Sequence, residues 1–340
     1  MIDLLVVGGG PAGLATAIHA ARAGLRVVVA EPRPTPVDKA CGEGLMPGAV
    51  RELTGLGVTV GGRPLRGIRY LDARRQVEAA FPDGPGRGVR RTELHAALAR
   101  RVAELGVPVL PLRVTAVRQD THAVTAAGIT ARYLAAADGL HSPIRRRLGL
   151  DGPRGPAPAR YGLRRHFAVP PWTDHVEVHW ADGAEAYVTP VGPELVGVAV
   201  LTRERRPFGE QLAGFPEVAA RLAGATGEGT AARGAGPLRR SVRARVAGRV
   251  LLVGDAAGYL DALTGEGIAL ALAAAGPLVR CVRADRPLEY ERAWRRLALR
   301  SRALTAALLW ARQQPLLADR IVPTAARFPA LFAAAVRQLA

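Results

Sequence analysis

The residues with the clearest chemical meaning stand near the start of the chain. Gly8, Gly10 and Gly13 form the pattern G-x-G-x-x-G, and Pro11 and Ala12 fill its last interval. Glycines at this spacing allow a tight turn, a close approach of the backbone to a pyrophosphate, and close packing of a helix on a strand. The pattern therefore predicts a dinucleotide site that involves all five residues.

The segments around this pattern predict the elements that hold it. Residues 2–7 and 26–30 are apolar runs of strand type, and residues 14–22 are rich in alanine with helical spacing. In such a β-α-β unit the pyrophosphate lies at the helix N-terminus, where free N–H groups point at it. Glu31, at the end of the second strand, is placed to accept hydrogen bonds from a ribose hydroxyl. The unit by itself does not distinguish NAD from FAD.

Two later segments lead from an apolar strand into a polar turn. Residues 133–145 run into an Asp-Gly pair that serine and arginine follow, and residues 251–258 run into a Gly-Asp pair. A Gly-Glu-Gly triplet at 265–267 then precedes a helical run. In kind, order and spacing, the three motifs resemble the flavoprotein monooxygenase superfamily of the para-hydroxybenzoate hydroxylase type, particularly its branch with geranylgeranyl reductases. The resemblance covers most of the chain.

This resemblance implies FAD as the cofactor. It implies that Asp255 bonds the ribityl chain or the pyrophosphate. Gly265 and Gly267 would direct N–H groups at the pyrimidine edge of the flavin, where they favour negative charge. Beyond the first pattern, the residues assigned to the cofactor are Arg51, Arg91, Val114, Asp138, Gly139, Gly254, Asp255, Gly265, Glu266 and Gly267.

Several of these assignments have a structural alternative. Arg91, and more loosely Arg51, resemble arginines that contact the FAD phosphates, but each is also explained as a solvated helix residue. Val114 falls where the family's strand passes the adenine. Asp138 belongs to a pair that connects the FAD region with the approach path of the pyridine nucleotide, and it is also explained as a turn residue. Asp255 is also explained as a helix N-cap.

The glycine-rich loop at 39–47 and the segment after the last strand hold candidate catalytic residues. Geranylgeranyl reductases have a similar loop beside the flavin, with a cysteine on the substrate side, so the resemblance implies that Cys41 and Glu43 belong to the active site. Cys41 is alternatively a small buried filler. Asp261 lies where many relatives have proline, and it is either a general base or substrate-positioning carboxylate, or the cap of a turn.

These residues together predict an enzyme, an FAD-dependent oxidoreductase. The favoured activity is that of an NAD(P)H-dependent monooxygenase, which inserts one atom of molecular oxygen into a small aromatic or polyketide-like substrate through a flavin hydroperoxide. The alternative is a reductase of carbon–carbon double bonds in a polyprenyl substrate, and a second alternative is a flavin-binding redox sensor without turnover. A long apolar tunnel would favour the reductase, and a compact pocket with a polar end would favour the hydroxylase.

Other site types have less support. No second dinucleotide fingerprint follows residue 31, so NAD(P)H is expected to bind transiently, and a protein like glutathione reductase is disfavoured. The W-x-W-x-I-P stretch of flavin-dependent halogenases is absent, which disfavours that activity. A metal site at His175 and His179 is disfavoured because the pair lies on a strand without a cysteine partner. No metal is predicted, and these histidines are expected to be partly exposed on the sheet.

The expected fold class is α/β, with a Rossmann-like FAD-binding domain, an inserted antiparallel β-sheet domain that binds the substrate, and C-terminal helices. The FAD-binding domain is expected to comprise residues 1–65, 86–155 and 240–285. The substrate domain is expected to comprise residues 66–85 and 156–239, with strands at 163–169, 176–180, 185–191 and 194–201. Residues 286–340 are expected to form the C-terminal helical segment.

Composition and charge narrow the possible partners. The chain has 340 residues and a net charge of +18. Its basic residues, all arginine except Lys39, are spread over the whole chain with few aromatic residues, so a small-molecule substrate is expected and no nucleic acid. Two cysteines far apart indicate a reducing compartment, and with no signal peptide at the N-terminus the expected location is cytoplasmic.

The C-terminal helices leave one partner open. The apolar run at 268–275 is too short to span a bilayer. Arginines alternate with leucine and alanine after residue 287, and this pattern favours a helix pair that covers the flavin domain. The alternative is a basic amphipathic surface in peripheral contact with a membrane, if the substrate is a lipid.

Overall fold

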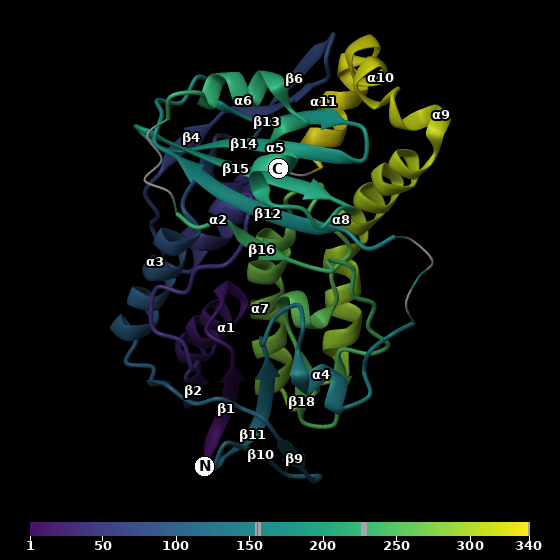
Figure 1. Ribbon diagram of the computed structural model, residues 1–340. Helices are drawn as coiled ribbons and strands as arrows, with labels where there is room; N and C mark the ends of the chain where they lie inside the picture. The colour runs from purple at the N-terminus through teal and green to yellow at the C-terminus, as the bar shows by residue number, and fades with distance from the viewer. Residues whose placement is uncertain (154, 156–157, 226–229, 339–340) are drawn as a thin grey trace.

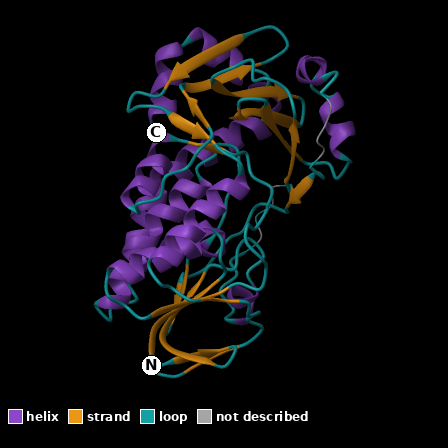
Figure 2. Cartoon of the chain, turned by 90° about the vertical axis from the view of Figure 1, so that its left-hand side faces the viewer, coloured by secondary structure: helices purple, strands orange, loops and turns teal. Residues whose placement is uncertain are grey.

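Two β-sheets lie at opposite ends of the molecule, with helices along one side and loops between them (Figure 2). This computed structural model describes residues 1–153, 155, 158–225 and 230–338. The first sheet holds the N-terminus, and its strand β1 (Ile2–Val7) runs from there toward the middle of the molecule (Figure 1). The loops at the ends of such strands therefore face the second sheet.

The first sheet is formed by the apolar runs of the FAD-type motifs. Along its main path the strands are β17 (Val246–Ala247), β18 (Val250–Leu252), β11 (Ile129–Ala136), β1, β2 (Val27–Ala30) and β8 (Val109–Leu110). From β18 to β8 each strand is parallel to its neighbour. An antiparallel extension to β11 is made by β9 (Val117–Gln119) and β10 (Val124–Ala126). The parallel strands end at one edge, which brings their distant turns together.

Helix α1 (Pro11–Arg22) joins β1 to β2 and packs between α3 (Arg91–Glu104) and α7 (Gly267–Arg283). It begins three residues before the run predicted from alanine spacing, because the fixed φ of Pro11 suits the first helical position. Gly24, with φ +75°, follows the end of the helix, as the sequence predicts. Two shorter helices, α2 (Pro47–Gly55) and α4 (Pro143–Arg147), complete this half of the molecule.

The second sheet contains the strands predicted for the substrate domain. In spatial order they are β16 (Arg233–Ala235), β12 (Tyr161–Phe167), β15 (Leu195–Thr202), β14 (Ala184–Gly192), β13 (His175–Ala181), β5 (Gly67–Leu71) and β6 (Gln76–Ala80). The prediction of a wholly antiparallel sheet is wrong at one pair, since β5 and β13 run parallel. These two strands come from distant parts of the chain, so no hairpin forces them to be antiparallel. A small sheet of β3 (Gly44–Leu45), β7 (Gly86–Gly88) and β4 (Arg63–Leu65) lies beside them.

Alternation along these strands gives the second sheet two apolar faces. One face packs on α5 (Phe208–Ala213) and α6 (Pro216–Leu222), through side chains that include Val188 and Val198. The other face, which includes Val176 and Val178 as the alternation predicts, looks toward the first sheet. The substrate sheet is therefore covered on one side and open on the side that faces the cofactor motifs.

The histidines of this sheet are buried, which corrects the expectation that they are partly exposed. His166 is 2% exposed, and His175 and His179 are each 8% exposed. Their burial is possible because each imidazole contacts a carboxylate, which for His166 is Glu43 and for the other two is a neighbouring acidic residue of β13 or its approach.

The C-terminal helices serve both sheets. The first half of α8 (Glu289–Gln313) packs on α7 and buries Tyr290 and Trp294 in the core of the first sheet. Helices α10 (Ile321–Arg327) and α11 (Pro329–Arg337) pack against β6, and the short helix α9 (Pro315–Ala318) packs on α8. The Phe332 ring lies 4.7 Å from that of Tyr70. The prediction that the C-terminal helices cover the flavin domain therefore holds only for α8. The last helices bury their apolar residues in the core beside the substrate sheet.

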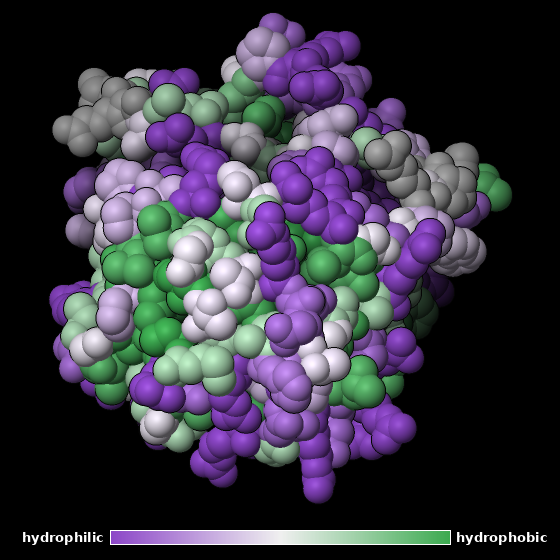
Figure 3. Space-filling model, turned by 90° about the horizontal axis from the view of Figure 1, so that it is seen from below, coloured by the Kyte–Doolittle hydropathy of each residue, from purple (hydrophilic) through white to green (hydrophobic). Residues whose placement is uncertain are grey.

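The strand assignments support the discontinuous division into a cofactor unit and a substrate unit, whose boundaries stay a prediction. Residues 154, 156–157, 226–229 and 339–340 of the predicted segments lie outside the described residues. Within the described part of the chain, no helix combines the length and apolarity needed to cross a membrane. The face seen from below mixes hydrophobic and hydrophilic side chains, in agreement with the even spread of arginine along the sequence (Figure 3).

Candidate active site

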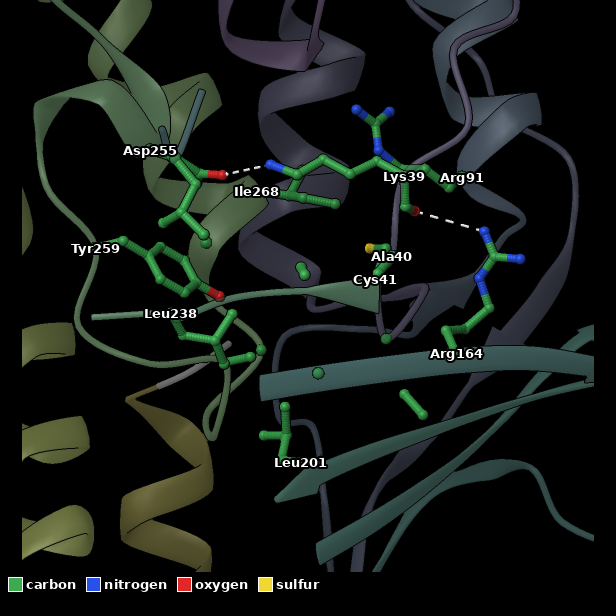
Figure 4. A pocket seen from close by; sticks show the side chains of 18 of the residues that line it. Lys39, Ala40, Cys41, Arg91, Arg164, Leu201, Leu238, Asp255, Tyr259 and Ile268 are labelled. Carbon is green, nitrogen blue, oxygen red and sulfur yellow. Dashed lines mark hydrogen bonds and ion pairs between the residues drawn. The ribbon is translucent and has the colours of Figure 1, made fainter. Parts of the chain in front are cut away.

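A cavity of about 700 Å³ lies between the carboxyl edge of the first sheet and the open face of the second (Figure 4). The ends of β1, β11 and β18 reach it, and so does the start of α7. Most of the predicted cofactor residues line it; they are Gly10, Pro11, Ala12, Arg91, Asp138, Gly139, Gly254, Asp255, Gly265 and Gly267. Parallel strands thus bring together motifs that are far apart in the sequence.

The three glycines of the first motif have different surroundings. A Cβ on Gly13 would stand 1.8 Å from the carbonyl oxygen of Gly8, and a Cβ on Gly8 would stand 2.3 Å from that of Ala137. These two glycines allow close packing of α1, β1 and β11. A Cβ on Gly10 would meet nothing within 4 Å, because Gly10 faces the cavity. Gly10 therefore leaves space for a ligand rather than for the protein itself.

Glu31 lies at the end of β2, as predicted, and its oxygens have protein partners. The N–H of Gly9 donates to Oε2 at 2.8 Å, and the Arg33 side chain donates to both carboxylate oxygens. Burial opposes ionisation of this carboxyl, but the hydrogen bonds from Arg33 and Gly9 outweigh it, so the pKa of Glu31 is lowered. Arg33 also lines the cavity, but no sequence pattern indicates it, because only Glu31 matches a known motif.

Two buried polar groups face the cavity with an atom left over for a ligand. Arg91, at the start of α3, is 6% exposed, and its Nη1 has no hydrogen-bond partner among the described residues. Burial lowers the pKa of this guanidinium. Asp138 Oδ2 accepts from the N–H of Ile144, whereas Oδ1 lacks a partner within the described chain. Burial raises the pKa of Asp138.

Lys39 and Asp255 meet across one end of the cavity. Lys39 Nζ lies 2.8 Å from Asp255 Oδ2, and Figure 4 shows the two side chains reaching toward each other. Asp255 stands in a short 3-10 turn (Gly254–Ala257) directly after β18. Lys39 is therefore the ion-pair partner of a residue that is predicted to contact the cofactor. The only signal for Lys39 in the sequence is that it is the chain's single lysine.

Six predicted cofactor residues lie outside the group of described residues that line the cavity: Gly8, Gly13 and Glu31, whose surroundings are given above, and Arg51, Val114 and Glu266. Arg51 is exposed on α2, and its Nη1 lies 3.8 Å from Asp83. Val114 is buried in the core of the first sheet, in a segment without regular structure rather than in a strand. Glu266 is the N-cap residue of α7, and its neighbours Gly265 and Gly267 line the cavity in its place. The predicted contacts of Arg51 and Val114 with the cofactor have no support in this geometry.

The loop before β3 places two candidate catalytic residues in the cavity wall. Cys41 lies near the centre of the view in Figure 4 and is partly exposed to the cavity. Burial raises the pKa of its thiol. Glu43 also lines the cavity but is only 3% exposed, because its carboxylate accepts hydrogen bonds from the protein on both oxygens. Cys41 therefore has the accessible reactive atom, and Glu43 does not.

Asp261, the third candidate, points into the protein. Its Oδ1 accepts from the N–H of Leu263 at 3.1 Å, so it caps the turn before the Gly-Glu-Gly triplet. Its Oδ2 lies 3.6 Å from Arg160, which also bonds Glu185. Arg312 of α8 donates to the same Glu185 at 2.8 Å. Of the two alternatives for Asp261, the geometry supports the turn cap, within a buried charge cluster that the sequence did not reveal.

The wall opposite the cofactor motifs is apolar. Described residues of the substrate sheet that line it include Ile68, Tyr70, Val176, Val178, Tyr187, Ala199 and Leu201, with Leu238 and Tyr259 nearby. The Tyr187 hydroxyl donates to the carbonyl of Leu263, so this polar atom is occupied. The alternation of 176–180 predicts part of this wall, but the contributions of β5 and β15 depend on how the strands are ordered in space.

Comparison with known proteins identifies the family. A model described as "FAD dependent oxidoreductase" matches residues 3–36, and one described as "FAD binding domain" matches residues 111–281, which is half of the chain. The chain belongs to the FAD-dependent oxidoreductases of the group A flavoprotein family. Its resemblance to that family, its α/β fold and FAD as its cofactor are thereby confirmed.

Relatives of this FAD-dependent oxidoreductase have several activities. It is 35% identical over 302 residues to "Menaquinone reductase" of Mycobacterium tuberculosis (strain ATCC 25618 / H37Rv), a match that covers 78% of this chain and 72% of that protein. It is 31% identical over 295 residues to "Dialkyldecalin synthase" of Streptomyces rugosporus, with coverage of 78% and 61%. A shorter match, 32% over 188 residues, is to a 3-(3-hydroxy-phenyl)propionate/3-hydroxycinnamic acid hydroxylase of Mycobacterium avium (strain 104), with coverage of 44% and 31%.

Solved structures share its fold. The flavin-dependent brominase Bmp2 superposes with a TM-score of 0.84 at 18% identity, over 99% of this chain and 93% of that chain. The halogenase PltM in complex with phloroglucinol and FAD superposes with a TM-score of 0.75 at 16% identity, over 92% and 76%. At these identities the likeness shows the fold alone, and the absence of the halogenase stretch from the sequence still disfavours halogenation.

The residues in the cavity fit FAD. Gly10 and the N-terminus of α1 offer space and N–H groups for a pyrophosphate, and the free Nη1 of Arg91 offers a buried positive donor. The oxygen of Asp138 that has no hydrogen-bond partner among the described residues offers an acceptor for a ligand hydroxyl or N–H. The backbone at Gly265 and Gly267, where α7 begins, faces the same space. These assignments to parts of FAD stay predictions, but each rests on an atom that the protein leaves available.

Proposed function

We propose that this FAD-dependent oxidoreductase reduces a carbon–carbon double bond in an apolar polyprenyl substrate, with a menaquinone-like lipid as the first candidate. The observation that carries the proposal is the apolar wall opposite the cofactor motifs, with Cys41 at its border. The relatives named menaquinone reductase support the same choice, because they match most of the chain. The proposal adopts the reductase alternative of the sequence analysis in preference to the monooxygenase.

The wall supports an apolar substrate for a physical reason. Leu201, Val176 and Val178 offer hydrocarbon surface, and burying apolar ligand surface against them is favourable by about 25 cal/mol per Å². An aromatic hydroxylation substrate would need a polar partner deep in the pocket. Tyr187 is already bonded to a backbone carbonyl, and Asp261 is directed away from the cavity. Tyr70 and Tyr259 also bring hydroxyl groups to the lining, but most of the wall is hydrocarbon, which favours a largely apolar substrate.

Reduction of a double bond adds two hydrogen atoms, one as hydride and one as a proton. When bound and reduced, FAD supplies the hydride. Cys41, which lines the cavity, would deliver the proton to the other carbon, and burial raises the pKa of its thiol, which keeps the thiol protonated at neutral pH. The thiolate then regains a proton from solvent at the cavity mouth. The apolar wall excludes water from the reacting carbons.

Product analysis tests this proposal. The protein is reduced anaerobically with NADH or NADPH, mixed with menaquinone in detergent, and the extracted lipid is analysed by mass spectrometry. We expect the lipid to gain two hydrogen atoms in its prenyl chain without oxygen. A gain of one oxygen atom, seen only after air is admitted, would contradict the reductase and support the monooxygenase. Unchanged lipid together with unreduced flavin would contradict both and favour the redox sensor.

The monooxygenase stays the second candidate because a hydroxylase is among the relatives. Its distinguishing property is the reaction of the reduced protein with oxygen. Rapid mixing of the reduced protein with oxygenated buffer reports on this in the flavin spectrum. A stabilised oxygen adduct would favour hydroxylation, and direct return to the oxidised spectrum would favour reduction. NAD(P)H as the reductant and a cytoplasmic location stay predictions.

A lipid substrate brings the predicted membrane contact into the proposal. The C-terminal helices expose Trp310, Leu316, Phe328 and Leu331, and Leu316 is 84% exposed. Arg320 and Arg327 are exposed in the same segment. Apolar side chains flanked by arginine suit the interface of an anionic bilayer. We propose that this segment makes a peripheral contact with the surface of anionic membranes.

Vesicle sedimentation tests the membrane contact. We expect the protein to sediment with phosphatidylglycerol vesicles and not with phosphatidylcholine vesicles, since the chain has a net charge of +18. The double variant Leu316→Asp/Leu331→Asp is expected to lose about ten-fold or more in vesicle affinity, because two exposed apolar side chains that would enter the bilayer interface are replaced by charges. Leu288→Asp, at an equally exposed leucine at the other end of α8, is the matched control. Equal loss in the control would contradict a specific surface.

A further inference from the structure

The loop that holds Cys41 is attached to the substrate sheet on both sides of the cysteine. Before it, Arg164 of β12 bonds the Asp38 carboxylate and donates to the Lys39 carbonyl at 3.4 Å. Figure 4 shows this arginine reaching the loop from below. After it, His166 of β12 contacts Glu43 Oε2 at 2.6 Å. The thiol therefore lies between two fixed points that one strand supplies.

A row of three residues across the sheet forms the second fixed point. His166 on β12 pairs with Gly197 on β15, and Gly197 pairs with Thr189 on β14. The Thr189 hydroxyl donates to the carbonyl of Gly42 at 2.9 Å. A Cβ on Gly197 would stand 2.9 Å from Glu43 Oε2, so only glycine leaves room for the carboxylate between the other two side chains. We call His166, Gly197 and Thr189 the loop platform.

The donors around His166 determine its tautomer. Arg164 Nη1 lies 3.1 Å from His166 Nδ1, and a guanidinium can only donate, so Nδ1 accepts. The ring proton is then on Nε2, which donates to Glu43 Oε2. The other oxygen of Glu43 accepts from the N–H of Arg91 at 2.8 Å, at the start of α3. One carboxylate thus joins the cysteine loop to the substrate sheet and to the helix of a predicted FAD contact.

The backbone conformation of Glu43 is unfavourable for a residue with a side chain, which indicates that the carboxylate is required at this position. Glu43 has φ +61°, a left-handed conformation that costs a residue with a side chain about 1 kcal/mol or more. Glycine would remove this strain but would also remove the carboxylate. In this conformation the N–H of Glu43 donates to Cys41 Sγ at 3.3 Å. The same residue therefore orients the sulfur through its backbone and holds the loop through its side chain.

We infer that the loop platform, acting with Arg164 through Glu43 and Gly42, positions the thiol of Cys41 at the cavity. These residues are positioning residues and touch no reacting atom. The inference deepens the proposed function, because it assigns the substrate sheet a second task beside lining the cavity. It predicts that the reactivity of Cys41 depends on residues of three strands that lie more than 120 positions away in the sequence.

Thiol alkylation tests the inference without any substrate. The FAD-loaded protein is treated with iodoacetamide, and the modification rates of Cys41 and Cys281 are followed by peptide mass spectrometry. We expect His166→Leu and Gly197→Ala to accelerate alkylation of Cys41 about ten-fold, because losing a charge-assisted hydrogen bond favours local opening by at least that factor. Thr189→Val is expected to give a smaller acceleration. His166→Gln keeps a donor toward Glu43 and is expected to restore the slow rate.

Controls separate positioning from general loosening. His179→Leu removes another buried histidine of the same sheet, whose partner is Glu177, and Gly209→Ala adds a methyl group where nothing lies within 4 Å. Both are expected to leave Cys41 alkylation unchanged, and Cys281 is the internal reference. Unchanged Cys41 rates in both His166→Leu and Gly197→Ala, or equal acceleration at Cys281, would overturn the inference. Either result is independent of whether menaquinone is reduced, so failure of the proposed function is recognised separately.

Discussion

Replacing Gly10 with alanine is expected to weaken FAD binding by about 100-fold while the protein without FAD stays folded. The added Cβ enters the space of the cavity and meets no protein atom within 4 Å, so the fold has no reason to change. A pyrophosphate at the N-terminus of α1 would be pushed away from the N–H groups, and losing two charge-assisted hydrogen bonds corresponds to about 3 kcal/mol, or about 100-fold. Fluorescence titration of the apoprotein with FAD measures this change.

Gly13→Ala is the matched substitution with the opposite expected result. Its Cβ would stand 1.8 Å from the carbonyl oxygen of Gly8, inside the contact of α1 with β1. Relieving such a clash moves backbone, so we expect the free energy of unfolding without FAD to fall by about 3 kcal/mol. Thermal unfolding of both apoproteins separates the two effects. Equal melting of the two variants, or normal FAD affinity of Gly10→Ala, would contradict this assignment of the glycines.

Cys41→Ser is expected to lower turnover about 100-fold or more and leave the FAD content unchanged. If the thiol donates the proton during reduction, a serine hydroxyl is too weak an acid to replace it, and general acid catalysis contributes about 100-fold or more. The FAD content should persist, because the predicted cofactor contacts Gly10, Arg91 and Asp255 lie on other elements than the loop of Cys41. Steady-state turnover with menaquinone and the flavin absorbance of the purified protein are the two measurements.

The pH dependence of turnover tests the role of the Cys41 thiol independently. A proton donor works below its pKa, and burial raises that of the Cys41 thiol. Turnover of the unmodified protein is therefore expected to fall only at a pH above the ordinary range of a cysteine thiol. Cys281→Ser, at a buried cysteine of α7 in the core of the first sheet, should change neither turnover nor its pH profile. Full activity of Cys41→Ser would contradict a catalytic role and support the alternative that Cys41 only fills space in the protein.

Sequence patterns predict the cofactor region because local chemistry determines it. A tight turn beside a pyrophosphate requires glycine, and apolar strands must end where polar turns begin, so Gly8, Gly10 and Gly13 are recognisable from spacing alone. The parallel direction of the strands then places Asp138 and Asp255 at the same edge as Gly10. Arg51 and Val114 were assigned from position in a resemblance, without a local chemical requirement, and the geometry does not support them.

The substrate side was less predictable because it depends on contacts between distant segments. Alternation indicates which face Val176 and Val178 share, but not that the parallel neighbour of β13 comes from residues 67–71. Asp261 and Glu43 are both carboxylates beside the flavin motifs. Only their partners, the N–H of Leu263 for one and His166 with Arg91 for the other, show that both are occupied.

The sequence by itself determined that this chain is an α/β flavoprotein and where its cofactor motifs lie, because those motifs are short and their chemistry is local. The tertiary structure decided what surrounds the cysteine. Arg164, His166, Gly197 and Thr189 have ordinary strand spacing, and nothing in their order marks them. They matter because the packing of one sheet on the loop of another excludes water, and each buried polar atom then needs a partner that only the fold can supply.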